Sequence, residues 1–428
     1  MFNTRKWSIL LISALLMAAL ALSVSAQESI TLTVWDNFTR DAEQAMIVEL
    51  HAQFVAEHPE VHIVRISYDT SSLTDLLPLS LASEGGPDVV MINQGFANMG
   101  ALVEAGLLLP LNDYADQFGW WDRYGMGLHT RNMWSADGTQ FGGDTLYGVS
   151  NTAEVVGVFY WRSDFEELGL SVPQTLEEFE TVLAALHDAG KTPIVFGSLD
   201  GWPAIHTLGA IQHSYGTREE ADAFTFRYES GTYATEANLL GAQTMVDWVN
   251  AGYFSPGFEG MDYDNATTGA FLNHEGAMWI TGSWMAGGIS QELGEDQVGF
   301  FLVPPAEAGA APLNVGGVGL GYGIRSTSAN PDLAAEYIDL MTSADAGALL
   351  LEYGYLPAVA VESDSITEGT LTADVIAAWN TISGADAVGH YWDWTVPDIA
   401  AYIQELLAGV TTPEAFIETV EAEYRAAE

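Results

Sequence analysis

Short β-rich runs alternate with helical periodicity from the start of this chain, and that rhythm limits its fold more than any other feature. ITLTVW (30–35) and VHIVRISY (61–68) are typical of strands. Between them, residues 41–57 place apolar side chains at helical spacing. PDVVMIN (87–93) is a third strand signal, followed by another helical segment. The alternation predicts an α/β fold in which a mostly parallel sheet is covered by helices.

A second α/β region follows the first. VVGVFYW (155–161) and TPIVF (192–196) indicate buried strands, and Thr175 with Glu178 matches a capping box that opens a helix between them. The Gly-rich stretch NVGGVGLGYGI (314–324) indicates extended backbone, and no G-x-G-x-x-G register fits its glycines, which excludes a nucleotide loop. A chain of roughly 400 residues is long enough for two hydrophobic cores.

Residues 1–26 have the pattern of a secretory signal peptide. Arg5 and Lys6 precede a long apolar run, which ends at the small residues Val24-Ser25-Ala26. The alternative interpretation is an uncleaved membrane anchor, because the run approaches the length of a membrane span. The chain contains no Cys, so it has neither disulfides nor a thiol for a lipid anchor. We therefore expect a soluble protein, periplasmic or extracellular, without a lipid anchor.

The charge balance excludes several classes of partner. The chain has 58 acidic and 12 basic residues. Removal of the signal peptide takes away Arg5 and Lys6, which leaves 10 bases against 58 acids, a net charge of −48. A field of that sign repels nucleic acid and anionic membranes. The acids are scattered rather than grouped, so they predict a strongly solvated surface, and we hypothesise a saline habitat.

Sequence signals for catalysis or metal binding are few. The chain lacks G-x-S-x-G and H-E-x-x-H, and without Cys it has no thiol nucleophile. DYDNATTGAFLN (262–273) approaches a calcium-loop pattern but has Thr267 and Asn273 where that loop needs Gly and Glu. We therefore expect no enzymatic activity, no cofactor and no metal.

Several segments, in order along the chain, resemble the extracellular solute-binding proteins of bacterial ABC importers, specifically the sugar-binding group to which maltose-binding protein belongs. The segments are GGPDVVMINQG (85–95), LVEAGLLLPLNDY (102–114), YGVSNTAEVVGVFYWRSDFEELGL (147–170), FLNHEGAMWITGSW (271–284) and NPDLAAEYIDLMTSADAGALLLEYGYLPAV (330–359). None is diagnostic alone, but together they span nearly the whole mature chain.

The resemblance implies a two-lobed periplasmic-binding-protein fold with a ligand in the cleft between the lobes. The first lobe would comprise 27–149 with 316–344, and the second 150–315 with 345–428. Hinge strands would cross between them at YGVSN and at the Gly-rich stretch, since hinges are short segments that absorb backbone rotation. The implied function is capture of a neutral mono- or oligosaccharide and its delivery, by transient contact, to an ABC transporter permease. We expect a monomer.

A sugar offers hydroxyls at its rim and C–H patches on its faces, so its site needs amides, carboxylates and flat aromatic rings. The resemblance implies such roles for Glu154, Asp200, Trp202, Trp284 and one of Trp392 or Trp394. If HYWDWTVPD (390–398) is extended, both of those tryptophans face the same way. Each tryptophan could instead be core. The polar candidates are Asn37 and Thr39, which follow the first strand, and Asn93 and Gln94, which follow the third; Thr39 could equally cap a helix.

Two alternatives remain open from the sequence. Acids and aromatic rings also form cages for cations, so the same fold could bind a polyamine or another cationic solute. A glycoside hydrolase needs two carboxylates beside such rings, although nothing in the sequence pairs any two of them.

Overall fold

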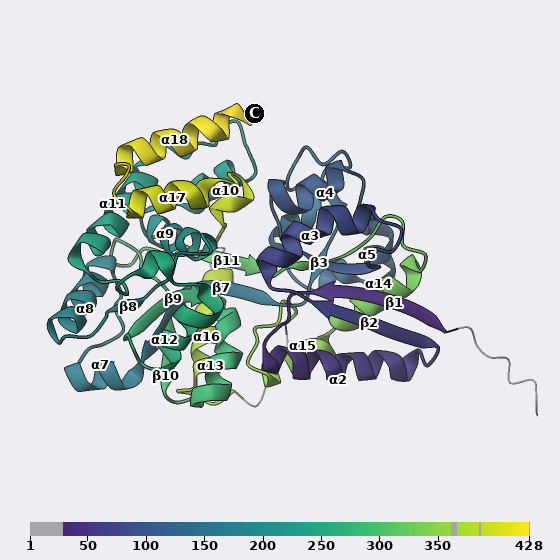
Figure 1. The fold of residues 1–428 in the computed structure, drawn as a ribbon, viewed down its shortest axis with the longest axis horizontal. Coiled ribbons are helices and arrows are strands. Elements are labelled where there is room, and N and C mark those ends of the chain that lie inside the picture. Colours follow the sequence, from purple (N-terminus) through teal and green to yellow (C-terminus); the bar gives the residue numbers. More distant parts are fainter. Residues whose placement is uncertain (1–28, 361–365, 385–386, 428) are drawn as a thin grey trace, which may run out of the picture.

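The computed structural model describes residues 29–360, 366–384 and 387–427. The expected signal peptide, residues 1–26, lies outside the described residues. The described chain forms two lobes, each built on its own sheet and covered by helices (Figure 1). The two-lobed α/β fold expected from the sequence is confirmed.

The first lobe is built on a five-stranded sheet in the order β2-β1-β3-β12-β6. Strands β1, β2 and β3 are parallel, and β12 runs antiparallel to β3 and β6. The strands are β1 (Ile30–Asp36), β2 (Val61–Ser67), β3 (Val89–Ile92), β12 (Gly321–Ile324) and β6 (Val149–Ser150). The carboxyl ends of β1, β2 and β3 point to the second lobe (Figure 1). Open α/β sheets bind ligands at that edge.

The helices of the first lobe pack on both faces of this sheet (Figure 1). They are α2 (Asp41–Glu57), α3 (Thr70–Ala82), η1 (Phe96–Gly100), α4 (Ala101–Glu104), α5 (Asn112–Phe118), η2 (Trp120–Asp122), α6 (Met126–His129), η3 (Thr130–Asn132), α14 (Pro331–Met341) and α15 (Ala344–Glu352). A small hairpin joins β4 (Met133–Trp134) to β5 (Thr145–Leu146). Helix α2 has the bounds expected from its periodicity, and the Glu43 side chain caps it by accepting from Arg40 N at 2.8 Å.

The second lobe is built on a six-stranded mixed sheet. Its order is β13-β11-β7-β9-β8, with β10 also paired to β7. The strands are β13 (Val388–Gly389), β11 (Asn314–Val318), β7 (Ala153–Trp161), β9 (Met278–Gly282), β8 (Ile194–Val195) and β10 (Val298–Phe301). The expectation of a mostly parallel sheet is wrong here, because β7 pairs antiparallel with β9, β10 and β11. The chain enters β7 directly from the first lobe, and those three neighbours run the opposite way.

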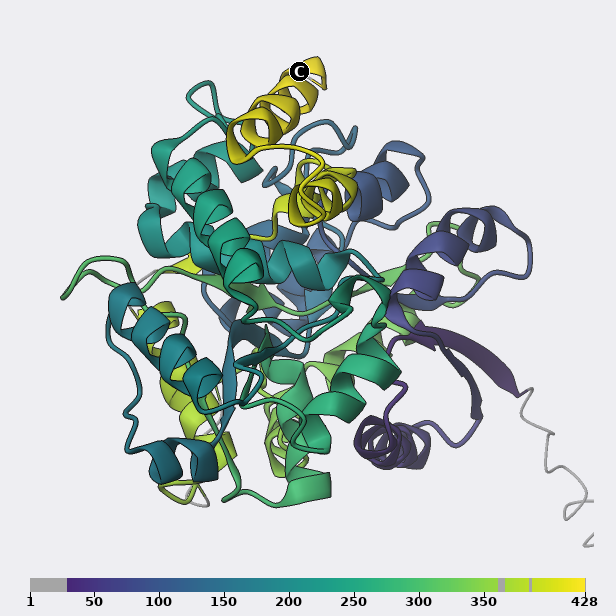
Figure 2. The same cartoon turned by 60° about the vertical axis from the view of Figure 1, so that its left-hand side comes forward.

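Helices cover both faces of the second sheet, with α9 on one side and α16 on the other. The helices are α7 (Arg162–Leu168), α8 (Leu176–Asp188), α9 (Trp202–Tyr215), α10 (Arg218–Thr225), α11 (Glu236–Ala251), η4 (Phe258–Gly260), η5 (Tyr263–Thr267), α12 (Thr268–Leu272), η6 (Ser283–Met285), α13 (Ala286–Leu293), α16 (Leu371–Gly384), η7 (Trp392–Trp394), α17 (Ile399–Leu407) and α18 (Pro413–Ala426). Helices α17 and α18 lie together at one end of the lobe in both views (Figure 2). The Thr175 hydroxyl caps α8 as expected, while Glu178 accepts from Gln174 N rather than closing a capping box.

Three extended segments pass between the lobes side by side. The first runs from β6 into β7, the second from β11 into β12, and the third follows α15. Backbone hydrogen bonds of 2.8 Å join Gly319 N to Thr152 O, Ala153 N to Leu356 O and Ala358 N to Asn151 O. The lobes therefore share a hinge of three strands.

The lobe division stays a proposal. Helix α15, which the division at 344/345 assigns to the second lobe, contacts α2 and α14. Those contacts favour a boundary after residue 352.

Candidate ligand-binding site

A cavity of about 430 Å³ lies between the two lobes. Its volume falls in the range of roughly 300–1,000 Å³ that is usual for small-molecule sites. The cavity brings together eight of the ten residues predicted from the sequence: Asn37, Thr39, Asn93, Glu154, Asp200, Trp202, Trp284 and Trp394. It excludes Gln94 and Trp392.

Six rings of the second lobe form a continuous surface, here called the aromatic wall: Tyr263, Trp202, Trp284, His206, Tyr391 and Trp394. The ring centroids of Tyr263 and Trp202 are 4.3 Å apart, Trp202 and His206 4.9 Å, His206 and Tyr391 4.5 Å, and Tyr391 and Trp394 5.3 Å. Trp284 lies beside this row, 5.6 Å from His206. Neighbouring rings in the row are inclined to one another by 44° to 64°, as tilted or edge-to-face pairs, and together they line one side of the cavity with apolar surface.

Hydrogen bonds fix the wall at the end formed by Tyr263. The Trp284 indole N–H donates to the Tyr263 hydroxyl at 2.8 Å, and that hydroxyl also bonds Thr281 at 2.9 Å. The Asp200 carboxylate accepts from Tyr263 N at 2.7 Å, so Asp200 holds the backbone of η5 in place. Asp200 therefore has a structural bond in addition to its position on the cavity.

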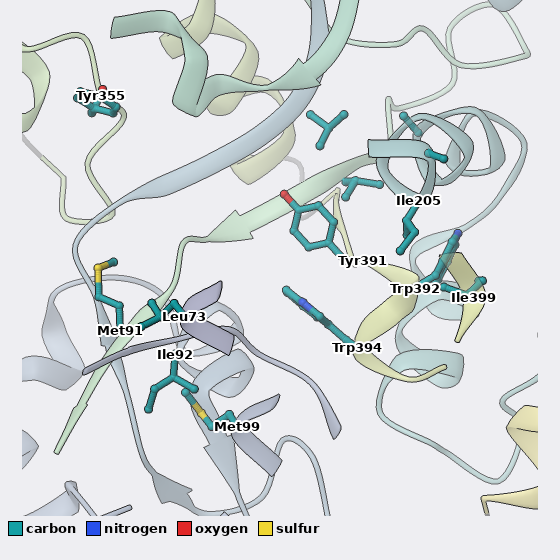
Figure 3. Packing of buried hydrophobic residues seen from close by; sticks show 14 of the residues in the cluster. Leu73, Met91, Ile92, Met99, Ile205, Tyr355, Tyr391, Trp392, Trp394 and Ile399 are labelled. Atoms are coloured by element: carbon teal, nitrogen blue, oxygen red, sulfur yellow. The ribbon is translucent and has the colours of Figure 1, made fainter. Parts of the chain in front are cut away.

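The expectation that Trp392 and Trp394 face the same way is wrong. Residues 392–394 form a 3₁₀ helix, in which side chains two apart diverge. Trp392 points into the core beside Ile205 and Ile399, whereas Trp394 lies with Tyr391 on the other side (Figure 3). The Trp392 ring stacks on His213 at 4.6 Å, and its N–H donates to Gln212 at 2.7 Å. Trp392 is a core residue.

Gln94 is also misassigned by the sequence, because it belongs to the hinge. The side chain is buried, and its amide donates to Gly319 O at 2.9 Å and to Asn132 Oδ1 at 3.2 Å. These bonds tie the end of β3 to the hinge segment between β11 and β12. The preceding residue, Asn93, lines the cavity as predicted.

The first lobe faces the aromatic wall with polar groups. Asn37 and Thr39 follow β1, and Asn37 Nδ2 donates to the Thr70 hydroxyl at 3.2 Å. Helix α2 has Arg40 at its N-cap, so Thr39 is not the cap and its side chain is exposed at the cleft. A ligand in the cavity thus meets rings on one side and hydroxyl or amide groups on the other.

Of the described residues that line the cavity, Arg40 is the one arginine or lysine, and carboxylates of both lobes neutralise its charge. It bonds Glu43 at 3.1 Å within the first lobe and Asp264 at 3.2 Å across the cleft. Burial alone would lower the pKa of Arg40, but Glu43 and the other acidic groups around it outweigh burial and raise that pKa above its usual value. Arg40 stays charged and joins the two lobes.

Two carboxyl groups in the cavity have strongly shifted acidities. Burial raises the pKa of Glu154 to about 7, although Tyr391 and Arg131 oppose the shift. Burial likewise raises the pKa of Asp393 to about 6. Burial lowers the pKa of His206 to about 3, so this imidazole is neutral. The centre of the site therefore carries less charge than its composition suggests.

Several buried polar atoms at the cavity have no hydrogen-bond partner among the described residues. They include Asn37 Oδ1, His206 Nδ1 and Asp393 Oδ1. Buried polar atoms are normally paired, so these three are available to a polar ligand. They surround the aromatic wall, which suits a molecule with apolar faces and many hydroxyls.

Sequence reasoning missed His206, Tyr263, Tyr391 and Asp393. Tyr391 and Asp393 lie in HYWDWTVPD (390–398). In an extended backbone they would face away from Trp392 and Trp394, so the sequence did not predict that they line the cavity. His206 lies one helical turn after Trp202 in α9, and that spacing was the one available signal for it. Tyr263 carried no signal, because only the fold brings η5 beside α9.

The described residues contain neither a cluster suited to a metal ion nor a helix suited to a membrane span. Within the described residues, no group of three or more His, Cys, Asp or Glu side chains is placed to hold a metal ion. The segment 262–273, compared above with a calcium loop, forms η5 and α12. Among residues 29–360, 366–384 and 387–427, no helix has the length and apolarity needed to cross a bilayer.

Two lobes on a three-stranded hinge, with rings and polar groups facing each other across the cleft, define a class of proteins that close over a small solute. Comparison with known families agrees: residues 39–348 match the model described as bacterial extracellular solute-binding protein. The chain belongs to this family.

Characterised relatives have names that refer to sugars. The chain is 24% identical over 341 residues to the multiple sugar-binding protein of Streptococcus mutans, covering 78% of this chain and 77% of that protein. It is 25% identical over 297 residues to the alpha-glucosides-binding periplasmic protein of Rhizobium meliloti, covering 65% of this chain and 61% of that protein.

Solved structures have the same fold. A chitin oligosaccharide binding protein superposes with a TM-score of 0.80 at 24% identity, covering 94% of this chain and 99% of that chain. A solute-binding protein solved in complex with raffinose gives a TM-score of 0.74 at 20% identity, and the match covers 93% of this chain and 99% of that chain.

Proposed function

We propose that this protein captures a neutral mono- or oligosaccharide in the cleft between its lobes and delivers it to the permease of an ABC transporter. The observation that carries the proposal is the aromatic wall, with polar groups of the first lobe opposite and unpartnered Asn37, His206 and Asp393 atoms around it. Rings suit the C–H faces of a pyranose, and the free polar atoms suit its hydroxyls.

The names of relatives support the sugar class. The two characterised relatives are named for sugars and alpha-glucosides, and solved structures of the same fold are described with chitin oligosaccharide and raffinose. These names belong to those proteins; together they favour a saccharide here without selecting one. Export to the periplasm or the exterior fits the family, and we propose that the protein acts there as a monomer.

The charges in the cleft determine which saccharides can bind. Among the described residues that line the cavity, Arg40 is the one Arg or Lys, and it is already paired with Glu43 and Asp264. The site therefore disfavours sugars that carry a phosphate or carboxylate group. The surplus of acids over bases is the one observation that favours the second candidate, a cationic solute held against the same rings.

We propose binding without turnover. Capture needs closure around the ligand, and closure occurs when contacts to both lobes exceed its free-energy cost. Steady release of product from glycosides incubated with the protein would contradict this part of the proposal.

The proposal is tested with a panel of neutral mono- and oligosaccharides, read by calorimetry and tryptophan fluorescence. At least one sugar is expected to bind. The Trp202→Phe variant should weaken that sugar at least fivefold, because it removes part of the stacking surface. The matched Trp392→Phe variant changes a core indole that does not reach the cavity, so it should leave affinity unchanged. A silent panel, or equal effects of the two variants, would refute the proposed site.

A further inference from the structure

The lobes touch at both ends of the aromatic wall. One contact is formed by Trp394, the last ring of the wall, and the other by the Arg40–Asp264 pair beside Tyr263, the first ring. The space between these two contacts is the cavity.

The contact at Trp394 is tight and largely apolar. Gly95 of the first lobe lies so close that a Cβ atom there would be 2.5 Å from Trp394 Cα. The Trp394 ring is 6.1 Å from that of Phe141, also of the first lobe, and only 1% of the residue is exposed. Behind it, the guanidinium of Arg227 from the second lobe lies 4.4 Å from the Phe96 ring of the first lobe. Side chains of both lobes close this end.

The opposite end is closed by charge. Arg40 Nη2 bonds Asp264 Oδ1 across the cleft at 3.2 Å, and Asp264 directly follows Tyr263. The Arg40 guanidinium cannot swing away freely, because Glu43 holds it from the first lobe at 3.1 Å. A ligand lying along the wall therefore meets a first-lobe contact at each of its ends.

We infer that the cleft encloses a mono- or disaccharide whole and does not bind an inner stretch of a longer chain. The inference rests on the proposed function and specifies its substrate. A saccharide that extended past either end would have to separate Trp394 from Gly95, or Arg40 from Asp264, so the lobes could not close around it. The cavity of about 430 Å³ is also in the lower half of the usual range for small-molecule sites, roughly 300–1,000 Å³.

The test is a calorimetric titration of the full mature chain with homologous oligosaccharides of one to six units. Four series are used: β-1,4-linked xylose, β-1,4-linked glucose, α-1,4-linked glucose and β-1,4-linked N-acetylglucosamine. In whichever series binds, affinity should be greatest at one or two units and at least tenfold weaker at four. Affinity that stays level or rises towards six units would overturn the inference and leave the proposed function intact. Silence of every series would overturn the proposed function, and this inference with it.

Two variants of the aromatic wall distinguish an effect on the preferred length of the saccharide from a general loss of ring stacking. Trp394→Ala keeps the Cα and Cβ atoms beside Gly95 but removes the ring that faces Phe141 of the first lobe at 6.1 Å. The affinity of the tetrasaccharide relative to the disaccharide should therefore rise at least fivefold. Trp202→Ala removes a ring that lies between Tyr263 and His206 and forms neither end of the wall, so both affinities should fall together and their ratio stay within twofold. Equal ratios in the two variants would overturn the inference.

A second pair of variants avoids the buried indole, whose loss could prevent folding. Arg227→Ala removes the guanidinium from the Phe96 ring and should shift the length preference in the same direction as Trp394→Ala. Arg162→Ala is the matched control, because the Arg162 guanidinium lies 5.8 Å from the Tyr160 ring. Arg162 begins α7, which lies on the side of the second lobe that faces away from the first lobe (Figure 1). A shift as large in the control as in Arg227→Ala would count against the inference.

Discussion

At the scale of single residues, Glu154 is a carboxyl group of the cleft whose pKa is raised. It is the second residue of β7, just past the hinge, and burial raises its pKa from 4.5 to about 7. The folded protein therefore holds a proton on this group between those two values while the unfolded chain has lost it. Its contribution to stability is present in full below pH 4.5 and is lost as the pH rises through 7.

We expect Glu154→Gln to stabilise the protein at pH 8, by about 1–3 kcal/mol, because the variant cannot ionise. At pH 4.5 the two proteins should be nearly equal in stability. Urea denaturation at both pH values measures the difference. Glu49→Gln makes the same substitution at an exposed position of α2 and serves as the control. A Glu154→Gln effect that is the same at both pH values would contradict the assigned pKa.

At the scale of elements, the hinge strand β11 depends on a glycine. Gly317 has φ of +143°, and a Cβ atom there would lie 1.6 Å from the Arg131 guanidinium. Arg131 belongs to the first lobe, is fully buried, and donates to the carbonyl oxygens of Gly316 and Val388 in the second lobe. Arg131 therefore joins the two lobes, and its guanidinium occupies space beside residue 317 that any side chain larger than that of glycine would fill.

We expect Gly317→Ala to lower the free energy of unfolding by about 2–4 kcal/mol, because it combines an unfavourable φ with displacement of a buried charge. Urea denaturation measures the loss. Gly288→Ala provides the matched control, since Gly288 lies in α13 with no atom within 4 Å of the added Cβ. The control should be neutral or stabilising by up to about 1 kcal/mol. Equal losses in the two variants would refute the role given to Gly317.

At the scale of the whole molecule, both lobes carry the same sign of charge. Residues 27–150 with 319–352 contain 22 acids and 5 bases, net −17, and residues 151–318 with 353–428 contain 36 acids and 5 bases, net −31. Closing the cleft brings these two negative bodies together, so repulsion opposes closure. Arg40 relieves it at one point, through Asp264.

Salt screens this repulsion, since the Debye length falls from about 10 Å at 0.1 M to about 3 Å at 1 M. A neutral saccharide should therefore bind several-fold more tightly at 1 M than at 0.02 M salt. A cationic solute should bind more weakly as salt rises, because the same screening weakens its attraction to the cleft. Calorimetry across this range, with KCl as the salt, separates the two candidate ligands by the sign of the slope. A neutral sugar whose affinity falls with salt would contradict this account of closure.

The sequence alone determined the α/β class, the two-lobed fold and most of the cleft. Strand and helix signals are local, and the segments from 85–95 to 330–359 keep the order of a known family, so eight of the ten predicted side chains reach the cavity. The tertiary structure decided the rest. The side chains of Trp392 and Trp394 leave the same 3₁₀ helix in different directions, so Trp392 lies in the core and Trp394 on the cavity. Asn93 lines the cavity, whereas the next residue, Gln94, bonds the hinge. Such choices depend on which neighbours fill the space around a side chain, and those neighbours are distant in sequence: Gln212 for Trp392, Gly319 for Gln94, and Asp264 for Arg40.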